Sequence, residues 1–443
     1  MPRKRTREVE AEEAEDKERW GRRAQRWPHT GTCPRCVFRN SQLARRGKTL
    51  WVDCDPGHDD AFALYLAAWG TIDESGAPSR ASRATSRGTS NSVETEKTDK
   101  FDPTPLVLAG VSTVAGNQSI EKTTANARRV LHWIDWVGAR QREGGMCWDC
   151  HRFMTDNCRV FEGAGQPLLR EARICDEIHG ESGLDAVDGT SALPDPEPEE
   201  KRYVQVGDEP AAVAMFDAVK KADGDLIIVA TGPLTNVALM ISMYRTELNA
   251  LEKKPPIFFM GGAVGEGNTG ARAEFNMQCD PEAAHVVLES GLPLYMIPLE
   301  VTHTALATPD VIATLREKAL LHPEGEEHAK RVEALLTFFA KTYKDVFDFD
   351  HPPLHDPCAV WAAIEFAHGA PRAFEYTLER VDVERASPLT FGQTVVDRRR
   401  ARRRPDNVRL ARTVDARVFW NALARAIELH ATLAARQTHR RGP

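Results

Sequence analysis

The stretch that decides the fold of this chain is Thr49-Leu50-Trp51-Val52-Asp53-Cys54-Asp55-Pro56-Gly57-His58-Asp59-Asp60. Its apolar run, Leu50 to Val52, predicts a buried strand. Pro56-Gly57 ends that strand, because proline removes a ladder donor and glycine permits a sharp turn. The apolar residues 61–68 then predict a helix that begins near Asp59. A strand, a tight turn and a helix in this order form the first unit of an open α/β sheet.

Four carboxylates lie within eight residues at the carboxyl end of this predicted strand, namely Asp53, Asp55, Asp59 and Asp60. Alternation along a strand places the first two on the same side, and the first helical turn favours anions at the last two. Carboxylates at this density repel one another unless a cation lies among them, and hard oxygen ligands suit calcium or magnesium better than zinc. The alternative is a capped helix with solvated acids, although a cap needs only one aspartate.

Composition limits the classes of protein to which this chain can belong. Its 443 residues, 42% of them hydrophobic, suit one large α/β domain or two smaller ones. The formal net charge of −7 gives no sign of a nucleic-acid partner, and no run of 18 apolar residues predicts a membrane span. Nine scattered cysteines without an apolar leader indicate a reducing compartment, so we expect a cytoplasmic protein. The basic start, Arg3-Lys4-Arg5, leaves nuclear import open beside a solvated tail.

Charged and low-complexity segments divide the chain. We expect a disordered or weakly ordered charged arm at residues 1–46, a single domain at 47–435 and a tail at 436–443. Three segments of the chain contain few large apolar residues, so burial cannot offset the entropy of ordering them. Flexible inserts are therefore expected at three places, about residues 71–102, 139–157 and 398–405.

Two features of these segments have more than one interpretation. The Cys-x-x-Cys pairs at Cys33–Cys36 and Cys147–Cys150 leave a tetrahedral zinc site open, with ordinary unpaired cysteines as the alternative. The arginine-rich run 398–404 lies between two strand-like runs and predicts a solvated hairpin. RNA or an acidic partner bound by these arginines is the alternative.

The opening stretch resembles the Asp-x-Asp-Pro-Gly-x-Asp-Asp motif of the nucleoside hydrolases, the inosine–uridine-preferring family. Later segments resemble that family's other landmarks and occur in the same order: Thr113-Val114-Ala115-Gly116-Asn117, His179-Gly180-Glu181-Ser182-Gly183-Leu184, Gly232-Pro233-Leu234-Thr235-Asn236, the run from Met260 to Asn276, and His355-Asp356-Pro357. The resemblance covers about residues 48–434. It implies an open, mostly parallel Rossmann-like sheet of α/β class, flanked by helices, with the active site at the strand carboxyl ends. The alternation of strand and helix patterns independently predicts the same architecture.

The resemblance also implies an activity, the hydrolysis of the N-glycosidic bond of purine or pyrimidine ribonucleosides, uridine or inosine among them. A calcium ion would be held by Asp55, Asp60, the Thr231 carbonyl and Asp356. Asp55 would also act as general base, and His355 would face the leaving base. The remaining contacts to sugar and base would come from Asp59, Asn117, His179, Met260, Asn268, Glu274 and Asn276. Asp53 would orient the metal ligands, and the chain would assemble as a homodimer or homotetramer.

Two other functions stay open from the sequence. Asp53-x-Asp55 resembles the nucleophile and acid pair of haloacid-dehalogenase-like phosphatases, but that family carries Thr or Val where this chain has Gly57. A non-catalytic binding protein is the second alternative, although an unused site need not keep four carboxylates. One departure from the nucleoside hydrolase pattern is Glu300, where that family usually carries Asp.

Overall fold

The structure is a computed structural model that describes residues 48–72, 106–141, 159–195, 206–369, 373–399 and 403–438. The predicted charged arm, both Cys-x-x-Cys pairs and most of the inserts expected at 71–102 and 139–157 lie outside these residues.

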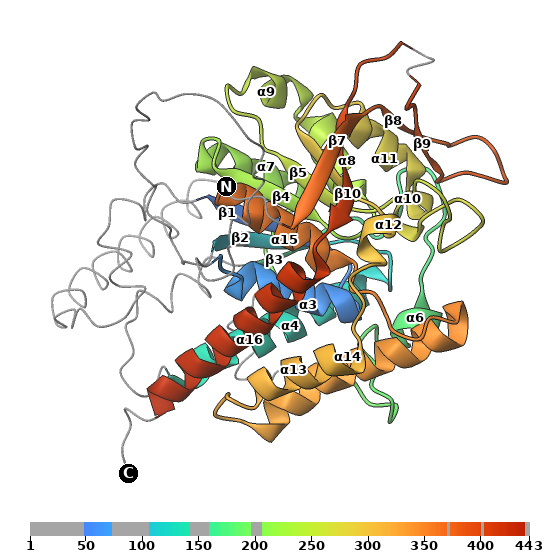
Figure 1. The fold of residues 1–443 in the computed structure, drawn as a ribbon. Helices are drawn as coiled ribbons and strands as arrows, with labels where there is room; N and C mark the ends of the chain where they lie inside the picture. Colours follow the sequence, from blue (N-terminus) through green and yellow to red (C-terminus); the bar gives the residue numbers. More distant parts are fainter. Residues whose placement is uncertain are drawn as a thin grey trace, which may run out of the picture.

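One sheet of eight strands forms the centre of the molecule (Figure 1). Its strands are β1 (Thr49–Cys54), β2 (Val107–Thr113), β3 (Val160–Glu162), β4 (Leu226–Ala230), β5 (Ile257–Met260), β6 (Leu294–Ile297), β7 (Phe374–Glu379) and β10 (Val408–Val414). They lie in the order β3-β2-β1-β4-β5-β6-β10-β7. All neighbours pair in parallel except β7, which is antiparallel to β10 at one edge. The predicted open, mostly parallel α/β sheet is confirmed.

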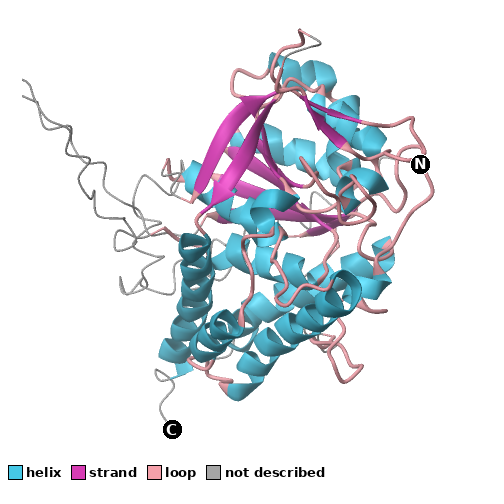
Figure 2. Cartoon of the chain, turned by 45° about the vertical axis from the view of Figure 1, so that its right-hand side comes forward, coloured by secondary structure: helices cyan, strands magenta, loops and turns pink. Residues whose placement is uncertain are grey.

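Helices cover both sides of this sheet (Figure 2). They are α3 (His58–Trp69), α4 (Ile120–Gln141), α6 (Asp176–His179), α7 (Ala211–Ala222), α8 (Thr235–Met243), α9 (Arg245–Ala250), α10 (Phe275–Cys279), α11 (Pro281–Leu288), α12 (Leu299–Thr302), α13 (Pro309–Ala319), α14 (Glu326–Phe347), α15 (Asp356–Ala367) and α16 (Ala416–Thr438). Successive side chains of β1 point to opposite faces of the sheet, so the strand contributes to the core on both sides. Leu50 and Val52 pack into the core with α3, α4 and α13 to α16, whereas Trp51 packs into the core with α7, α8, α9 and α11.

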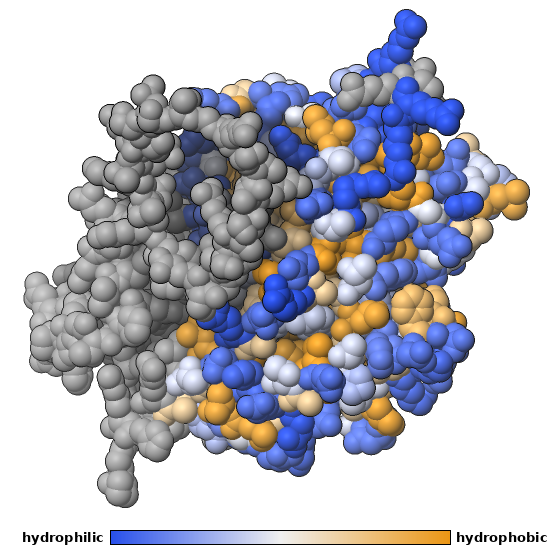
Figure 3. Space-filling model, viewed as in Figure 1, coloured by the Kyte–Doolittle hydropathy of each residue, from blue (hydrophilic) through white to orange (hydrophobic). Residues whose placement is uncertain are grey.

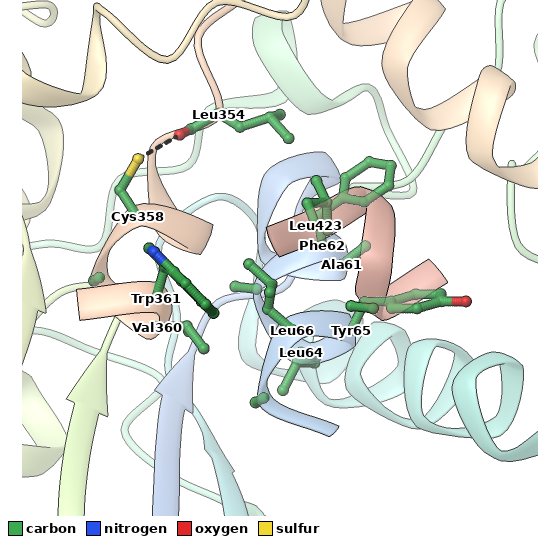
Figure 4. Close-up of a cluster of buried hydrophobic side chains, with 14 of the residues drawn as sticks. Ala61, Phe62, Leu64, Tyr65, Leu66, Leu354, Cys358, Val360, Trp361 and Leu423 are labelled. Carbon is green, nitrogen blue, oxygen red and sulfur yellow. Dashed lines mark hydrogen bonds between the residues drawn. The ribbon is translucent and has the colours of Figure 1, made fainter. Parts of the chain in front are cut away.

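Helix α3, which carries Asp59 and Asp60, is buried along its whole length. All twelve of its residues are buried, and after the polar first turn the helix is apolar on every side. Figure 4 shows Phe62 and Leu66 of α3 in one cluster with Trp361 of α15 and Leu423 of α16. This packing fixes the start of α3, and with it the two carboxylates, at the carboxyl ends of the central strands.

The hairpin predicted near the end of the chain is wrong. The strand-like runs beside the arginine-rich segment do not form a hairpin with each other. Strand β9 (Thr394–Val396) pairs with β8 (Val381–Val383) in a separate ribbon, while β10 enters the main sheet between β6 and β7. The chain between them is tied down at Arg404, which forms ion pairs with Glu289 and Asp382. Strand β6 stops at Ile297, because Pro298 cannot donate to the ladder and precedes α12.

In the part of the chain that the structure describes, no helix is both long enough and apolar enough to cross a membrane. Figure 3 shows polar residues over much of the described part of one face, with smaller apolar areas between them.

Candidate functional site

The loops that follow three neighbouring strands converge at the carboxyl edge of the sheet. Strand β1 lies between β2 and β4, with Asp53 opposite Ser112 on one side and Ala230 on the other. Asp55, Asn117 and Thr231 each come shortly after one of these strands. Crevices outside the carboxyl ends of parallel strands are where open α/β sheets bind ligands.

Three buried carboxylates form the centre of this edge. One side-chain oxygen from each of Asp59, Asp60 and Asp356 lies within 4.8 Å of the others. Asp60 accepts hydrogen bonds from the Gly57 amide at 3.0 Å and from the Thr231 hydroxyl at 2.8 Å. Asp59 accepts from the backbone amides of His355 and Asp356, at 3.3 and 3.4 Å, at the start of α15. The acidic first turns of α3 and α15 therefore lie next to each other.

Asp55 lies beside this cluster. Its Oδ2 atom accepts the Asn117 backbone amide at 2.8 Å, and the Asn117 side-chain amide donates both to the Asp55 carbonyl and to Asp60, each at 3.1 Å. Its Oδ1 atom is buried without a hydrogen-bond partner. The resemblance predicts Asp55, Asp60 and Asp356 as ligands, and the group of oxygens that lie within 4.8 Å of one another contains Asp59 in place of Asp55.

Among the described residues no Lys or Arg forms an ion pair with the four acids. Burial raises the pKa of Asp59 to about 7, and it raises the pKa of Asp55 and Asp356 well above the usual carboxyl range, with the neighbouring aspartates adding to each shift. Buried acids in this condition, one of them with an orphaned oxygen, fit a hard divalent cation.

Asp53 faces away from the cluster into the protein. Its Oδ1 atom accepts from the Ser112 hydroxyl at 2.5 Å and from the Asn236 amide at 2.8 Å. Its Oδ2 atom has no partner, and burial raises the pKa of Asp53 to about 7. Asn236 also donates to the Thr113 carbonyl, so Asp53 ties β1 to β2 and to the start of α8. This position agrees with the predicted supporting role.

The segment around α10 brings four more predicted residues to the same edge. The Glu274 carboxylate caps α10, because it accepts the backbone amides of Asn276, Met277 and Gly262 at 2.9, 3.1 and 2.8 Å. The Asn276 amide donates to the Thr231 carbonyl at 2.7 Å and lies 3.6 Å from the sulfur of Met260. The Asn268 Oδ1 atom accepts the Phe275 amide at 2.9 Å. These bonds hold the acid and the amides in place.

His355 is buried with a hydroxyl group on each ring nitrogen. Its Nδ1 atom lies 2.7 Å from the Thr302 hydroxyl, and its Nε2 atom lies 2.6 Å from the Tyr343 hydroxyl. Burial lowers the pKa of His355 well below its usual value, with His303 adding to the effect. The sequence indicated neither hydroxyl, since Thr302 looks like a turn residue and Tyr343 belongs to the apolar stripe of an amphipathic helix.

His179 lies next to the Pro-Gly turn. A side chain built on Gly57 would place its Cβ atom 2.4 Å from Nδ1 of His179, so only glycine permits this approach. The ring of His58, a residue without a role in our sequence-based prediction, stacks on His179 with 5.4 Å between ring centroids. Burial lowers the pKa of His58 to about 4 and that of His179 well below its usual value.

Comparisons with known proteins point to one family. The model of the family described as "Inosine-uridine preferring nucleoside hydrolase" matches residues 101–421. A "Probable ribonucleoside hydrolase" of Dictyostelium discoideum is 34% identical over 387 residues, covering 86% of this chain and 94% of that protein. A "Pyrimidine-specific ribonucleoside hydrolase RihA" of Shewanella sp. (strain ANA-3) is also 34% identical, covering 86% and 97%.

Solved structures show the same fold. The "Purine-Preferring Ribonucleoside Hydrolase from Gardnerella vaginalis" superposes with a TM-score of 0.64 at 24% identity, covering 87% of this chain and all of that one. An "Inosine-Guanosine Nucleoside Hydrolase" superposes with a TM-score of 0.63 at 22% identity, covering 86% and 98%.

Proposed function

This chain belongs to the inosine-uridine preferring nucleoside hydrolase family, and we propose below how its buried carboxylates and their neighbours carry out the reaction. It is a ribonucleoside hydrolase, an enzyme that cleaves the N-glycosidic bond of nucleosides. Membership of this family sets aside both the phosphatase and the non-catalytic binding protein. The observation that carries the proposed site is the buried cluster of Asp59, Asp60 and Asp356 beside Asp55, which has no Lys or Arg ion-pair partner in the part of the chain that the structure describes.

We infer that the cluster holds calcium, with Asp55, Asp60, the Thr231 carbonyl and Asp356 as ligands and Asp59 turned toward the ribose. When bound, such an ion gathers the sugar hydroxyls and lowers the pKa of a water molecule. The Thr231 carbonyl already accepts one hydrogen bond from Asn276 and keeps its second lone pair for a ligand.

Asp55 is the base in this proposal. The Asn117 amide fixes its Oδ2 atom, while its buried Oδ1 atom has no partner and is the free acceptor for a proton. Water gives that proton to Asp55 as its oxygen bonds to the anomeric carbon. The N-glycosidic bond breaks at the same centre, and its electron pair leaves with the base. Asp59, Asn117, Asn268, Glu274 and Asn276 hold the sugar, with Met260 packed against Asn276.

The leaving base then needs a proton. We propose that His355 supplies it together with Tyr343, because the Tyr343 hydroxyl and the His355 Nε2 atom share one short hydrogen bond. The hydroxyl gives its proton to the base nitrogen, the Nε2–H of neutral His355 stabilises the resulting tyrosinate by a hydrogen bond, and solvent water reprotonates Tyr343 after the base leaves. Thr302 on the other ring nitrogen keeps the imidazole oriented.

We also make proposals for the base that the enzyme prefers, for its assembly and for its location. The relatives described above include both purine-preferring and pyrimidine-specific enzymes, so we propose activity on purine or pyrimidine ribonucleosides, inosine and uridine first. We propose a single domain at residues 47–435, a homodimer or homotetramer, no nucleic-acid partner and a cytoplasmic location. Light scattering of the full chain tests the assembly, and cell fractionation tests the location.

The activity is tested by a reducing-sugar assay on inosine, uridine, cytidine and adenosine. We expect ribose from at least one of them in wild type and a loss of several orders of magnitude in Asp60→Asn, whose carboxylate joins the start of α3 to Thr231. Equal rates in both proteins would contradict the proposed site.

A further inference from the structure

The ribbon of β8 and β9 lies outside the main sheet and has no task in the proposed mechanism. It nevertheless lies beside the segment that carries Glu274 and Asn276 (Figure 1). Gln393, the residue before β9, forms an antiparallel bridge with Ala273, the residue before Glu274. The ribbon is therefore in direct contact with the segment that we propose to hold the sugar.

Thr394, the first residue of β9, is bonded to the loop that follows β5. Its side chain is buried, and its hydroxyl group accepts the backbone amide of Ala263 at 2.9 Å and donates to the carbonyl oxygen of the same residue. A hydroxyl group can form both bonds at once, because it has one hydrogen and two lone pairs. Thr394 therefore gives Ala263 the two hydrogen bonds that a residue of a partner strand would give.

Side chains bind every backbone amide in this part of the loop. The four consecutive amides of residues 262–265 each donate to a side-chain oxygen. The first donates to Glu274 at 2.8 Å, the second to Thr394, and the last two to Glu300 at 2.9 and 2.7 Å. Since these bonds use all four amides, the three side chains set the course of the loop.

The bond from Gly262 joins this loop to the proposed sugar site. It holds the Glu274 carboxylate on one side, while the first amides of α10 hold it on the other. A shift of the loop must therefore move this carboxylate or break one of its bonds. Thr394 acts on both residues of the loop that matter here. A side chain on Gly262 would place its Cβ atom 2.8 Å from Cγ2 of Thr394, so the Thr394 methyl group packs against Gly262 while the hydroxyl group binds Ala263.

The ribbon is itself fixed through its other strand. The side chain of Asn407 accepts the backbone amide of Val381 in β8 at 2.8 Å, and it donates to the carbonyl oxygens of Val381 and Leu288, each at 2.9 Å. The neighbouring Arg380 forms an ion pair with Glu289. Leu288 and Glu289 lie at the end of α11, so these bonds tie the ribbon to that helix.

We propose that Thr394 is a positioning residue for the sugar of the substrate. Its hydroxyl group holds Ala263, and with it Gly262, in the place where the Gly262 amide fixes the Glu274 carboxylate. The β8–β9 ribbon is the support that carries this hydroxyl group. The inference rests on the proposed function, because it takes Glu274 to hold the sugar.

Two substitutions separate the hydroxyl group of Thr394 from its methyl group. Thr394→Val keeps the shape of the side chain and removes both hydrogen bonds, whereas Thr394→Ser keeps the hydroxyl group and removes the methyl contact. We expect kcat/KM for inosine or uridine to fall at least about tenfold in Thr394→Val, the effect of one buried hydrogen bond, and to stay near the wild-type value in Thr394→Ser. Equal falls in both variants would overturn the proposal. Should Thr394→Val not fold, Thr394→Ala and Thr394→Ser make the same comparison, because they differ only in the hydroxyl group.

Inhibition by the two products distinguishes an effect on the sugar from general damage. The inhibition constant of ribose should rise about tenfold in folded Thr394→Val. That of hypoxanthine or uracil should stay at the wild-type value, because Glu274 holds the sugar and not the base. Equal rises of both constants would overturn the proposal, and so would an unchanged constant for ribose.

Thr123→Val is the matched control. It makes the same change at a buried hydroxyl group of α4, which donates to the Ile120 carbonyl at 3.2 Å. Both inhibition constants and kcat/KM should keep their wild-type values in this variant. A rise of the ribose constant equal to that in Thr394→Val would contradict the special role of Thr394.

Hydrogen–deuterium exchange tests the loop without substrate. Peptides that cover residues 261–265 should exchange faster in Thr394→Val than in wild type, and Thr394→Ser should keep the slow exchange. Wild-type exchange in Thr394→Val would overturn this inference alone. Absence of ribose release by wild type from every nucleoside would instead contradict the proposed function, and with it the role of Glu274 on which this inference rests.

Discussion

Asp53 and Asp55 are two residues apart at the end of the same strand, yet the protein surrounds them differently. Asp53 is bonded to Ser112 and Asn236 inside the sheet, whereas Asp55 keeps one oxygen free beside the carboxylate cluster. Strand alternation alone puts both on one side, so the sequence predicts their proximity but not which of them reaches the site. The partners decide that, and they come from residues about 60 and 180 positions away.

Substitution separates the two aspartates. Asp55→Ala should lower kcat for inosine or uridine by at least about 10²–10⁴-fold, because it removes the proton acceptor. Asp53→Asn should cost far less, since the amide still accepts from Ser112 through its oxygen. Ribose release under saturating substrate measures both. Near-normal rates for Asp55→Ala would remove it from the mechanism.

His355 and Tyr343 are expected to act on the leaving base as one unit. His355→Ala and Tyr343→Phe should each lower turnover of inosine and uridine by about 10²–10⁴-fold, the usual range for general acid catalysis. Hydrolysis of p-nitrophenyl β-ribofuranoside should stay near the wild-type rate, because its leaving group needs no proton. Equal losses on both kinds of substrate would instead assign His355 to support of Asp356 and the sugar site.

At the scale of elements, the sequence predicts strands better than their partners. The apolar run of β1 lies where its pattern places it, since burial is a local signal. The hairpin at the arginine-rich run is wrong because pairing is not local. Arg404, in the chain between β9 and β10, forms ion pairs with Glu289 and Asp382, and the two strands pair in different sheets.

Two successive helix caps offer a matched comparison. Glu274 caps α10 and Asp280 caps α11, and each accepts backbone amides at the start of its helix. Glu274→Ala and Asp280→Ala should each destabilise the protein by about 0.5–2 kcal/mol, measured by chemical denaturation. Only Glu274→Ala should also lower kcat/KM strongly, because it releases Asn276 from the Thr231 carbonyl. A full loss of activity in folded Asp280→Ala would contradict the special role of Glu274, because either cap would then be required by the site.

At the scale of the whole molecule, the sheet is a frame that places acids from distant segments in a single buried group. The start of α3 and the start of α15 are about 300 residues apart, and they meet through Asp59 and Asp356. The family resemblance predicts this meeting, but spacing within the sequence does not. Gathering uncompensated acids also has a consequence for stability, because burial favours their protonated forms.

The pH dependence of stability should reveal the buried proton on Asp53. The pKa of Asp53 is raised from its ordinary 3.8 to about 7, so the folded protein binds a proton that the unfolded chain releases between about pH 4 and pH 7. The stability contributed by this group is present below pH 4 and is lost as the pH rises toward 7. The buried histidines act in the opposite direction, so the comparison is between wild type and Asp53→Asn.

The expected result is that Asp53→Asn gains thermal stability relative to wild type between pH 5 and about 7.5. Differential scanning calorimetry in the presence of a chelator measures it, since bound cation would mask the acids of the cluster. A difference in Tm that does not change with pH would mean that Asp53 is ionised in the folded protein across this range.

The most direct measurement of the central claim is ribose release by exhaustively chelated protein, followed by titration with calcium. The buried cluster of Asp59, Asp60 and Asp356 beside Asp55 predicts that chelated wild type, shown metal-free by elemental analysis, releases no ribose from inosine or uridine. Calcium should restore full activity in wild type and not in Asp60→Asn. Full turnover by the metal-free protein would contradict the account.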